Sequence, residues 1–260
     1  MSNNTFKDNI IDEISKWLNE YLKKSGKNGF VFGMSGGVDS SVIALLAKEA
    51  LKRSPDKKLL ALLLPIRDLN KVDYYDEKIA MDIVKSFSIP YKLIDLTNIY
   101  QGIITLLDKS ADAVCYTNLK ARLRMSVIYF YANMLNYLVL GTVNKGEFYI
   151  GYFPKNASAG DILPIGGLLK KEIREIGKKL GLPSHIVQRK ASGCIWAPTA
   201  EEEWGFTEDE LDLMIELHEK GGNEGLLNEF EDSEKARIFL KKYQESEHKR
   251  KFYPIYKKLT

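Results

Sequence analysis

The chain has 260 residues, of which 45% are hydrophobic and 28% charged, and its net charge is +3. This is ordinary globular composition with a core large enough to fold without disulfides, and so weak a basic bias does not demand a nucleic-acid partner. The two cysteines, Cys115 and Cys194, lie far apart outside any C-x-x-C motif, which argues against a disulfide scaffold or zinc site and favours a cytoplasmic location. The polar start MSNNTFKDN predicts no secretory signal. The longest apolar run, residues 59–66, is far shorter than the roughly 20 residues of a membrane span, so no membrane partner is expected.

The hydrophobic pattern alternates between helix-like and strand-like segments. The first segment, residues 6–22, has apolar residues at helical spacing. Short apolar runs predict strands at 30–32, 59–64, 91–95 and 138–140, and helices are predicted at 42–51, 73–87, 113–136, 170–180, 208–220 and 233–245. The last two are predicted to be surface helices. This order predicts an α/β fold, a doubly wound parallel sheet with flanking helices, in one domain spanning residues 1–260. Two stretches without a clear period, 152–164 and 192–204, are expected to be functional loops.

A glycine-rich segment, Gly33-Met-Ser-Gly-Gly-Val-Asp-Ser-Ser41, lies between the first predicted strand and the following helix. Glycines let the backbone approach an anion closely, and a helix N-terminus presents free N–H groups to it. Asp39 would repel phosphate unless a cation lies between them, which points to Mg²⁺. Neither G-x-x-x-x-G-K-[ST] nor G-x-G-x-x-G occurs in the chain, so the segment is neither a standard P-loop nor a Rossmann fingerprint.

The segment Ser35-Gly-Gly-Val-Asp-Ser40 resembles the S-G-G-x-D-S signature of the N-type ATP pyrophosphatases, which cleave ATP between the α and β phosphates to adenylate a substrate. Four further segments resemble motifs of one branch, the ammonia-dependent NAD synthetases. They are Asn118-Leu-Lys-Ala-Arg-Leu-Arg-Met125, Gly141-Thr-Val-Asn-Lys-Gly-Glu147, Asp161-Ile-Leu-Pro-Ile165 with Lys170, and Glu247-His-Lys-Arg250. The resemblance implies amidation of nicotinate adenine dinucleotide to NAD through an acyl-adenylate, with ammonia as nitrogen donor and AMP and pyrophosphate as products.

The resemblance also implies the site residues, in four groups. Asp39 and Lys170 are the catalytic pair, and Asp39 and Glu147 hold Mg²⁺. The ATP-binding residues are Gly33, Met34, Ser35, Gly36, Gly37, Val38, Asp39, Ser40, Thr142, Lys170 and Ser192. The residues for the dinucleotide are Arg122, Lys155, Asp161, His248 and Lys249. A homodimer is also implied, and helix 113–136, apolar on more than one face, suits an interface. No amidotransferase segment is recognised, so free ammonia or a separate glutaminase chain would supply nitrogen.

Two segments depart from the family pattern. Residues 153–161 lack the aromatic residue and the G-D-G of the family's F-T-K-[FY]-G-D-G-G-A-D loop, and residues 191–203 differ from its P-[ST]-A-[DG]-L-W and G-Q-[ST]-D-E runs. Three alternatives therefore remain open. They are adenylation of a different carboxylate, nucleotide sensing without catalysis, and thiolation of a nucleic acid. The retention of Asp39, Glu147 and Lys170 argues against a sensor, and thiolation would require a cysteine pair or an RNA-binding extension that is not evident.

Overall fold

The computed structural model describes residues 9–67, 77–192 and 199–251. Its sheet has four parallel strands in the order β3-β2-β1-β4. The strands are β1 (Gly29–Gly33), β2 (Lys58–Leu63), β3 (Tyr91–Leu93) and β4 (Leu138–Val139). Each coincides with a predicted apolar run, so the parallel α/β sheet is confirmed.

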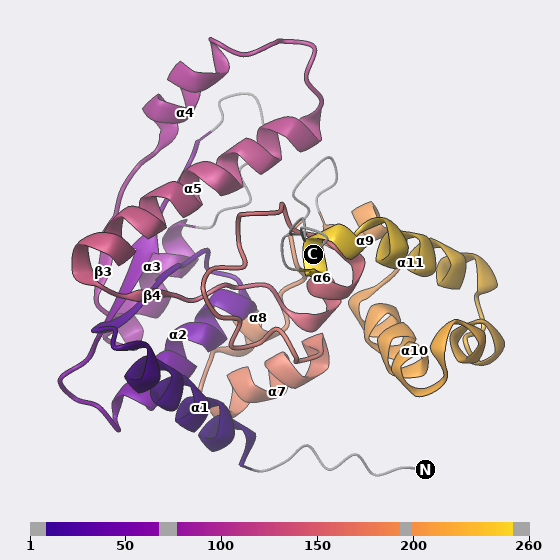
Figure 1. The fold of residues 1–260 in the computed structure, drawn as a ribbon, viewed down its shortest axis with the longest axis horizontal. Coiled ribbons are helices and arrows are strands. Elements are labelled where there is room, and N and C mark those ends of the chain that lie inside the picture. Colours follow the sequence, from indigo (N-terminus) through magenta and orange to yellow (C-terminus); the bar gives the residue numbers. More distant parts are fainter. Residues whose placement is uncertain (1–8, 68–76, 193–198, 252–260) are drawn as a thin grey trace, which may run out of the picture.

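Twelve helices are present in the described part of the chain (Figure 1). The first six are α1 (Ile10–Ser25), α2 (Val38–Leu51), α3 (Glu77–Ser86), α4 (Thr97–Ile104), α5 (Ala113–Leu135) and α6 (Lys145–Ile150). The others are α7 (Lys170–Lys179), α8 (Ser184–Val187), α9 (Ala200–Trp204), α10 (Glu208–Glu229), α11 (Ser233–Glu245) and α12 (Glu247–Arg250). The short helices α4, α6, α8, α9 and α12 are additions to the predicted set. None of the helices described here combines the length and apolar composition needed to cross a membrane.

Some predicted boundaries are corrected by the structure. Helix α2 begins four residues earlier than predicted, because the glycine-rich loop leads directly into it at Val38. Helix α10 extends to Glu229 and bends at Gly222, whose φ of 63° and ψ of −158° interrupt the helical backbone. The predicted start of helix 73–87 lies outside the described residues, as do residues 193–198 of the irregular stretch 192–204, which include Cys194.

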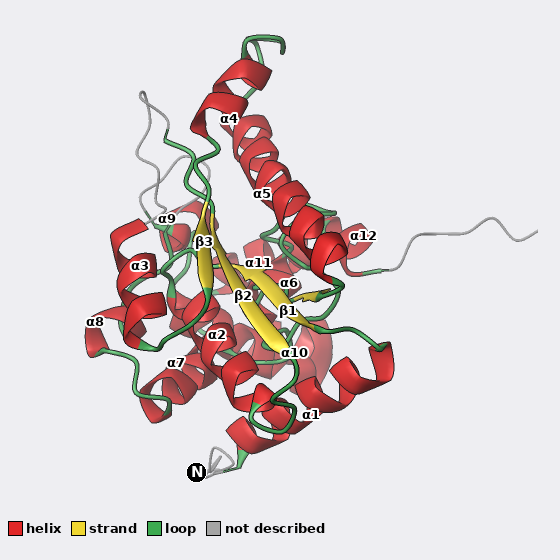
Figure 2. Cartoon of the chain, turned by 90° about the vertical axis from the view of Figure 1, so that its left-hand side faces the viewer, coloured by secondary structure: helices red, strands yellow, loops and turns green. Residues whose placement is uncertain are grey.

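Helices cover both faces of the sheet, as a doubly wound fold requires. Phe30 and Phe32 of β1 pack into a core with α1, α2, α3, α7 and α8, whereas Val31 points to the opposite face and packs in the core that includes α5. Figure 2 shows the strands between α2 and α3 on one side and α5 on the other. A third apolar cluster, with Trp204 and Phe239 at its centre, joins α6, α9, α10 and α11. The organisation of residues 1–260 as one domain stays a prediction.

The chain order of the strands reverses between β1 and β4. From β1 the chain continues to β2 and β3 on one side, and it returns to the other side of β1 to form β4. Such a reversal leaves a crevice at the carboxyl ends of β1 and β4, where ligands of open parallel sheets bind. The segments that leave this edge are the glycine-rich loop after β1 and the Gly141–Asn144 segment after β4.

Candidate active site

The loop between β1 and α2 leads into a helix N-terminus whose free backbone N–H groups suit an anion. Gly36 has a φ of 85°, a left-handed conformation that a side chain would strain. Gly37 is extended and forms the N-cap of α2, and no described side chain caps that helix end. The first-turn N–H groups of α2 are therefore available to a phosphate, together with the positive end of the helix dipole.

Two serines of the loop, Ser40 and Ser41, hold its backbone in shape, whereas the third, Ser35, faces solvent. Ser41 Oγ donates to the Gly37 carbonyl at 2.7 Å, and Ser40 Oγ lies 3.1 Å from the same carbonyl and from Ser35 Oγ. Both Ser40 and Ser41 are buried, whereas Ser35 is exposed. Of the three hydroxyls, that of Ser35 is thus the best placed to reach a ligand. Met34, also predicted to bind ATP, continues the sheet by donating its N–H to Leu62 O at 2.9 Å, and its side chain is buried.

A buried ion pair joins this loop to α7. Lys170 Nζ donates to Asp39 Oδ2 at 2.7 Å, and only 6% of the lysine side chain is exposed. Burial alone lowers the pKa of Lys170, but the carboxylates of Asp39, Glu208 and Glu147 more than reverse this, so its pKa lies above the usual range. Lys170 is therefore a permanent cation beside the glycine-rich loop. The structure brings together the two residues predicted to be catalytic.

The second carboxylate of the predicted metal pair belongs to α6. Asn144 caps this helix by accepting the Glu147 N–H at 2.9 Å, and Glu147 Oε2 accepts the Asn144 N–H at 3.2 Å. Burial raises the pKa of Glu147, and the Asp39 carboxylate raises it further. A carboxylate whose pKa is raised by burial and by a neighbouring carboxylate is a suitable ligand for a divalent cation.

Asp39 itself carries an oxygen suited to a cation. Its Oδ1 is buried and accepts no hydrogen bond from any residue that the structure describes. A buried carboxylate oxygen without a donor is costly unless a cation satisfies it. The described residues contain no cluster of three or more metal-ligating His, Cys, Asp or Glu side chains.

The remaining predicted ATP-binding residues lie at loop boundaries. Thr142 follows β4 as predicted, and its N–H donates to Ser158 O at 3.1 Å. Gly141, before it, allows the 158–160 segment to approach, because a Cβ there would lie 1.9 Å from Ala159 O. Ser192 pairs with Thr199 across an isolated antiparallel bridge, immediately before α9.

Four of the five residues predicted to bind the dinucleotide gather around the segment after α6. Arg122 Nη2 donates to Lys155 O at 3.3 Å, and Lys155 Nζ donates to His248 O at 2.8 Å. Lys249 Nζ donates to the carbonyls of Gly151 and Phe153 at 2.7 and 2.9 Å. Burial, and then the charge of Arg122, lower the pKa of Lys249. Residues from α5, the 152–164 segment and α12 thus form one basic cluster.

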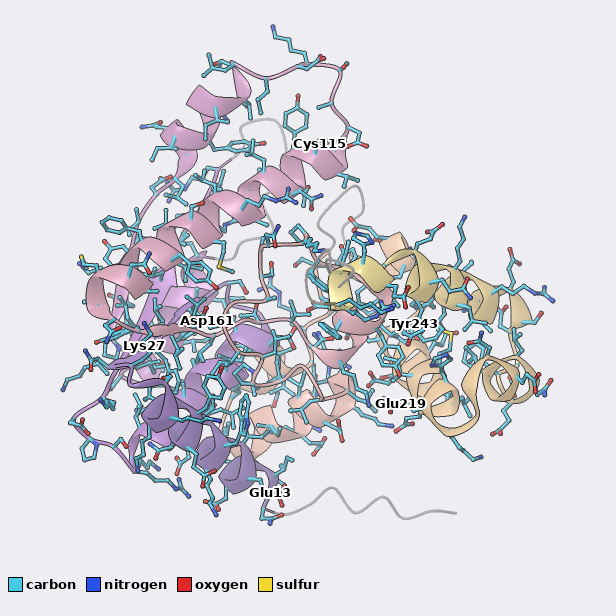
Figure 3. All side chains as sticks on the ribbon, in the orientation of Figure 1. Glu13, Lys27, Cys115, Asp161, Glu219 and Tyr243 are labelled. Carbon is cyan, nitrogen blue, oxygen red and sulfur yellow. The ribbon has the colours of Figure 1, made fainter. Side chains whose placement is uncertain are left out.

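Asp161, the fifth, makes structural contacts. Its Oδ1 accepts the Tyr129 hydroxyl at 2.9 Å, and its Oδ2 accepts the Val139 N–H at 2.8 Å. It therefore ties α5 to β4. Figure 3 shows Asp161 close to α5, on the opposite side of the molecule from Tyr243 and Glu219 of the α10–α11 region.

Comparison with known proteins identifies the family. The model of the NAD synthase family matches residues 10–253. The chain belongs to the NAD synthase family. The NH(3)-dependent NAD(+) synthetase of Finegoldia magna is 36% identical over 245 residues, which cover 94% of this chain and 93% of that protein. The synthetase of the same name from Methanocaldococcus jannaschii is 36% identical over 219 residues, 82% of each chain.

Solved structures of the NAD synthase family share the fold. An NMN synthetase from Francisella tularensis has a TM-score of 0.82 and 29% identity, covering 95% of this chain and 96% of that one. An NH3-dependent NAD synthetase from Campylobacter jejuni, in complex with the nitrate ion, has a TM-score of 0.77 and 28% identity, covering 95% and 97%. The family resemblance and the adenine-nucleotide α-hydrolase-like fold are confirmed, and membership implies an AMP-forming ligase that uses ATP.

Sequence reasoning missed three residues that organise this candidate site. Glu208 and Asp212, one helical turn apart on α10, are 3% and 2% exposed, although their helix was predicted to be a surface helix. Asp212 accepts the N–H groups of Lys170 and Lys171 at 3.0 and 2.9 Å and so caps α7. Arg250 donates to the carbonyls of Tyr149 and Tyr243, which fixes α12 beside α6. The sequence gives no signal for the acidic pair, because a run of charged residues is typical of a solvated helix face.

Proposed function

We propose that this chain catalyses the ATP-dependent amidation of nicotinate adenine dinucleotide to NAD, with ammonia as nitrogen donor. The observation that carries the proposal is the buried Asp39–Lys170 pair at the N-terminus of α2, in a chain that belongs to the NAD synthase family. A carboxylate does not react with ammonia at neutral pH, because oxide is a poor leaving group. Attack of the carboxylate oxygen on the α-phosphorus of ATP displaces pyrophosphate and forms an acyl-adenylate. Ammonia then attacks the acyl carbon, AMP leaves, and the nitrogen loses a proton.

The residues of the glycine-rich loop and of α7 serve the first step. The first-turn N–H groups of α2 hold the pyrophosphate end of ATP, and Ser35 adds a hydroxyl donor. The Lys170 ammonium stabilises the negative charge that develops on the phosphate oxygens as pyrophosphate leaves. Thr142 and Ser192 complete the ATP site in this proposal.

Asp39 and Glu147 are the proposed ligands of Mg²⁺. The buried Asp39 Oδ1, to which no described residue donates a hydrogen bond, supports this assignment, as does the raised pKa of Glu147, which burial and then the Asp39 carboxylate cause. When bound, Mg²⁺ supplies Lewis-acid stabilisation of the phosphate charge. The protein contribution is to present two carboxylates from helices that follow neighbouring strands, one after β1 and one after β4.

The basic cluster of Arg122, Lys155, His248 and Lys249 is the proposed site of the acid substrate. Its positive charge suits the phosphates of a nicotinate nucleotide. Asp161 would act from its position between Tyr129 and Val139, where it fixes the loop that carries Lys155.

Assembly and location form part of the same proposal. We propose a homodimer through α5, on which Phe130 and Met134 are 61% and 57% exposed. Free ammonia or a separate glutaminase chain supplies the nitrogen, and the enzyme acts in the cytoplasm. Sedimentation velocity at micromolar concentration tests the dimer, and a monomer would contradict it.

A second acid substrate is nicotinate mononucleotide, because the structure with a TM-score of 0.82 is described as an NMN synthetase. One assay tests both acids. Purified protein is incubated with ATP, Mg²⁺, ammonium and either the dinucleotide or the mononucleotide, and NAD, NMN and AMP are quantified. Equal amounts of NAD and AMP from the dinucleotide support the main proposal. Formation of NMN without NAD supports the second candidate. If neither the dinucleotide nor the mononucleotide leads to AMP, both candidates are contradicted.

A further inference from the structure

Lys170 lies between two buried carboxylates that come from different helices. Its Nζ is 2.7 Å from Asp39 Oδ2 on α2 and 3.4 Å from Glu208 Oε1 on α10. The Glu208 side chain is 3% exposed, against 17% for Asp39. The catalytic mechanism proposed above uses Asp39 and Lys170 and assigns nothing to Glu208.

The surroundings of Glu208 fix its position. Its Oε2 accepts a hydrogen bond from Arg174, and its backbone N–H donates to Glu201 Oε1 at 3.0 Å. Its Oε1 is buried and accepts no hydrogen bond from any residue in the described ranges. Asp212, one turn later, holds the backbone of Lys170. Glu208 therefore presents one unused acceptor oxygen toward an ammonium that is itself held in place.

Two cations compete for Asp39. A divalent cation that binds the Asp39 carboxylate weakens the hold of that carboxylate on Lys170 Nζ. An ammonium released inside a buried site without another acceptor would be strongly unfavourable. A shift of about half an ångström brings Lys170 Nζ to hydrogen-bond distance from Glu208 Oε1. The second acceptor is thus within reach of the lysine without movement of either helix.

Building on the proposed function, we propose that Glu208 is a positioning residue that holds the Lys170 ammonium when Asp39 binds a divalent cation. Lys170 then remains in the site as a second cation for the phosphates of ATP. Glu208 acts through Lys170 and touches neither the metal nor the nucleotide. Removal of the Glu208 carboxylate should therefore weaken metal-dependent nucleotide binding only when Lys170 is present.

The test is a double-mutant cycle on binding. The Kd of the full chain for α,β-methylene-ATP, which cannot be cleaved to pyrophosphate, is measured by calorimetry over a range of Mg²⁺ concentrations. We expect Glu208→Gln to raise the Mg²⁺ concentration needed for half-maximal binding about tenfold, a typical coupling between two sites. In the Lys170→Met background the same change should have no further effect. Glutamine keeps an acceptor for Arg174, so this variant is the mildest that removes the charge.

Controls separate positioning from loss of charge or fold. Glu210→Gln removes a carboxylate from the same helix, where Glu210 pairs with Lys235, and should leave the Mg²⁺ dependence unchanged. Thermal unfolding verifies that each variant is folded. If Glu208→Gln does not fold, Glu208→Asp, which keeps the charge on a shorter side chain, is used in the same cycle with a smaller expected rise.

If Glu208→Gln raises the Mg²⁺ concentration for half-maximal binding equally with and without Lys170, Glu208 acts through its charge alone and the proposal is overturned. No rise in either background would also overturn it. The synthesis of NAD by the wild-type chain is measured separately. If that chain makes NAD and the cycle shows no coupling, the role of Glu208 is wrong. If the coupling is present without NAD or NMN synthesis, the proposed function is wrong and the role of Glu208 stands.

Discussion

The Asp212 carboxylate accepts the backbone N–H of Lys170 at 3.0 Å, so a side chain of α10 caps α7, the helix that carries the lysine proposed to be catalytic. Leu169, at the N-cap of α7, has no side chain able to do this. Asp212→Ala should destabilise the fold by about 1–3 kcal/mol, the cost of leaving buried donors unpaired, and should also lower turnover. Urea unfolding and pyrophosphate release measure the two effects.

The matched control is Asp232→Ala. Asp232 caps α11 by accepting the N–H groups of Glu234 and Lys235, both at 3.1 Å. This variant should lose about 1 kcal/mol, a typical N-cap contribution, while its turnover stays near that of the wild type. Equal losses of turnover in the two variants would show that Asp212 affects activity through stability alone.

Asp39→Asn and Glu147→Gln test the metal assignment. Each should keep the fold and lose about 10²-fold or more of Mg²⁺-dependent turnover, because each removes a few kcal/mol of transition-state stabilisation. Asp12→Asn is the control, since Asp12 pairs with Arg53 on the surface. Near-normal pyrophosphate release in both site variants would refute the assigned roles.

Lys155→Ala tests the basic cluster as the proposed binding site of the acid substrate. The KM for nicotinate adenine dinucleotide should rise, with a smaller effect on the KM for ATP, because the binding of one substrate is lost. Initial rates with each substrate varied in turn give both constants. Lys178→Ala, which removes an exposed lysine paired with Glu175, should change neither. If only the KM for ATP rises, Lys155 belongs to the ATP site and not to the site of the acid substrate.

Glu210 makes folding stability depend on pH. Its hydrogen bond from Lys235, and then that from the Thr207 N–H, lower its pKa below the ordinary 4.5. The unfolded chain therefore takes up the proton first as pH falls, and the contribution of Glu210 is present above about pH 4.5 and lost below it. Urea unfolding should show Glu210→Gln less stable than the wild type at pH 7, with the difference narrowing as pH falls below 4.5. A constant difference would contradict this.

The sequence predicts the sheet well because its strands are buried on both faces. Leu59–Leu64 has no polar residue, and only a central strand of a covered sheet tolerates such a run. The loop after β1 was predicted because its chemistry is local, with glycines and hydroxyls in one segment. Helix α6 was missed because six residues that include a glycine carry too little periodic signal.

The acidic residues of α10 could not be placed from sequence. Glu208 and Asp212 lie in a run of charged residues that is typical of a solvated helix face. Their burial depends on the packing of α7 against that face. The N–H groups that Asp212 caps belong to Lys170 and Lys171, which are 42 and 41 positions away in the sequence. Likewise, the basic residues of the acid site come together only after α5, α6 and α12 have packed.

The pairing of β1 with β4 also joins two strands that the ribosome makes far apart in time. Val31 pairs with Leu60 early in the chain, but its partner on the other side, Val139, is made only after β2, β3 and α5. Until then, one edge of the central strand is open, and an open apolar edge invites pairing with other chains. The ribosome thus releases the glycine-rich loop long before the segment that completes its crevice. We therefore expect nascent chains that stop before residue 138 to depend on chaperones.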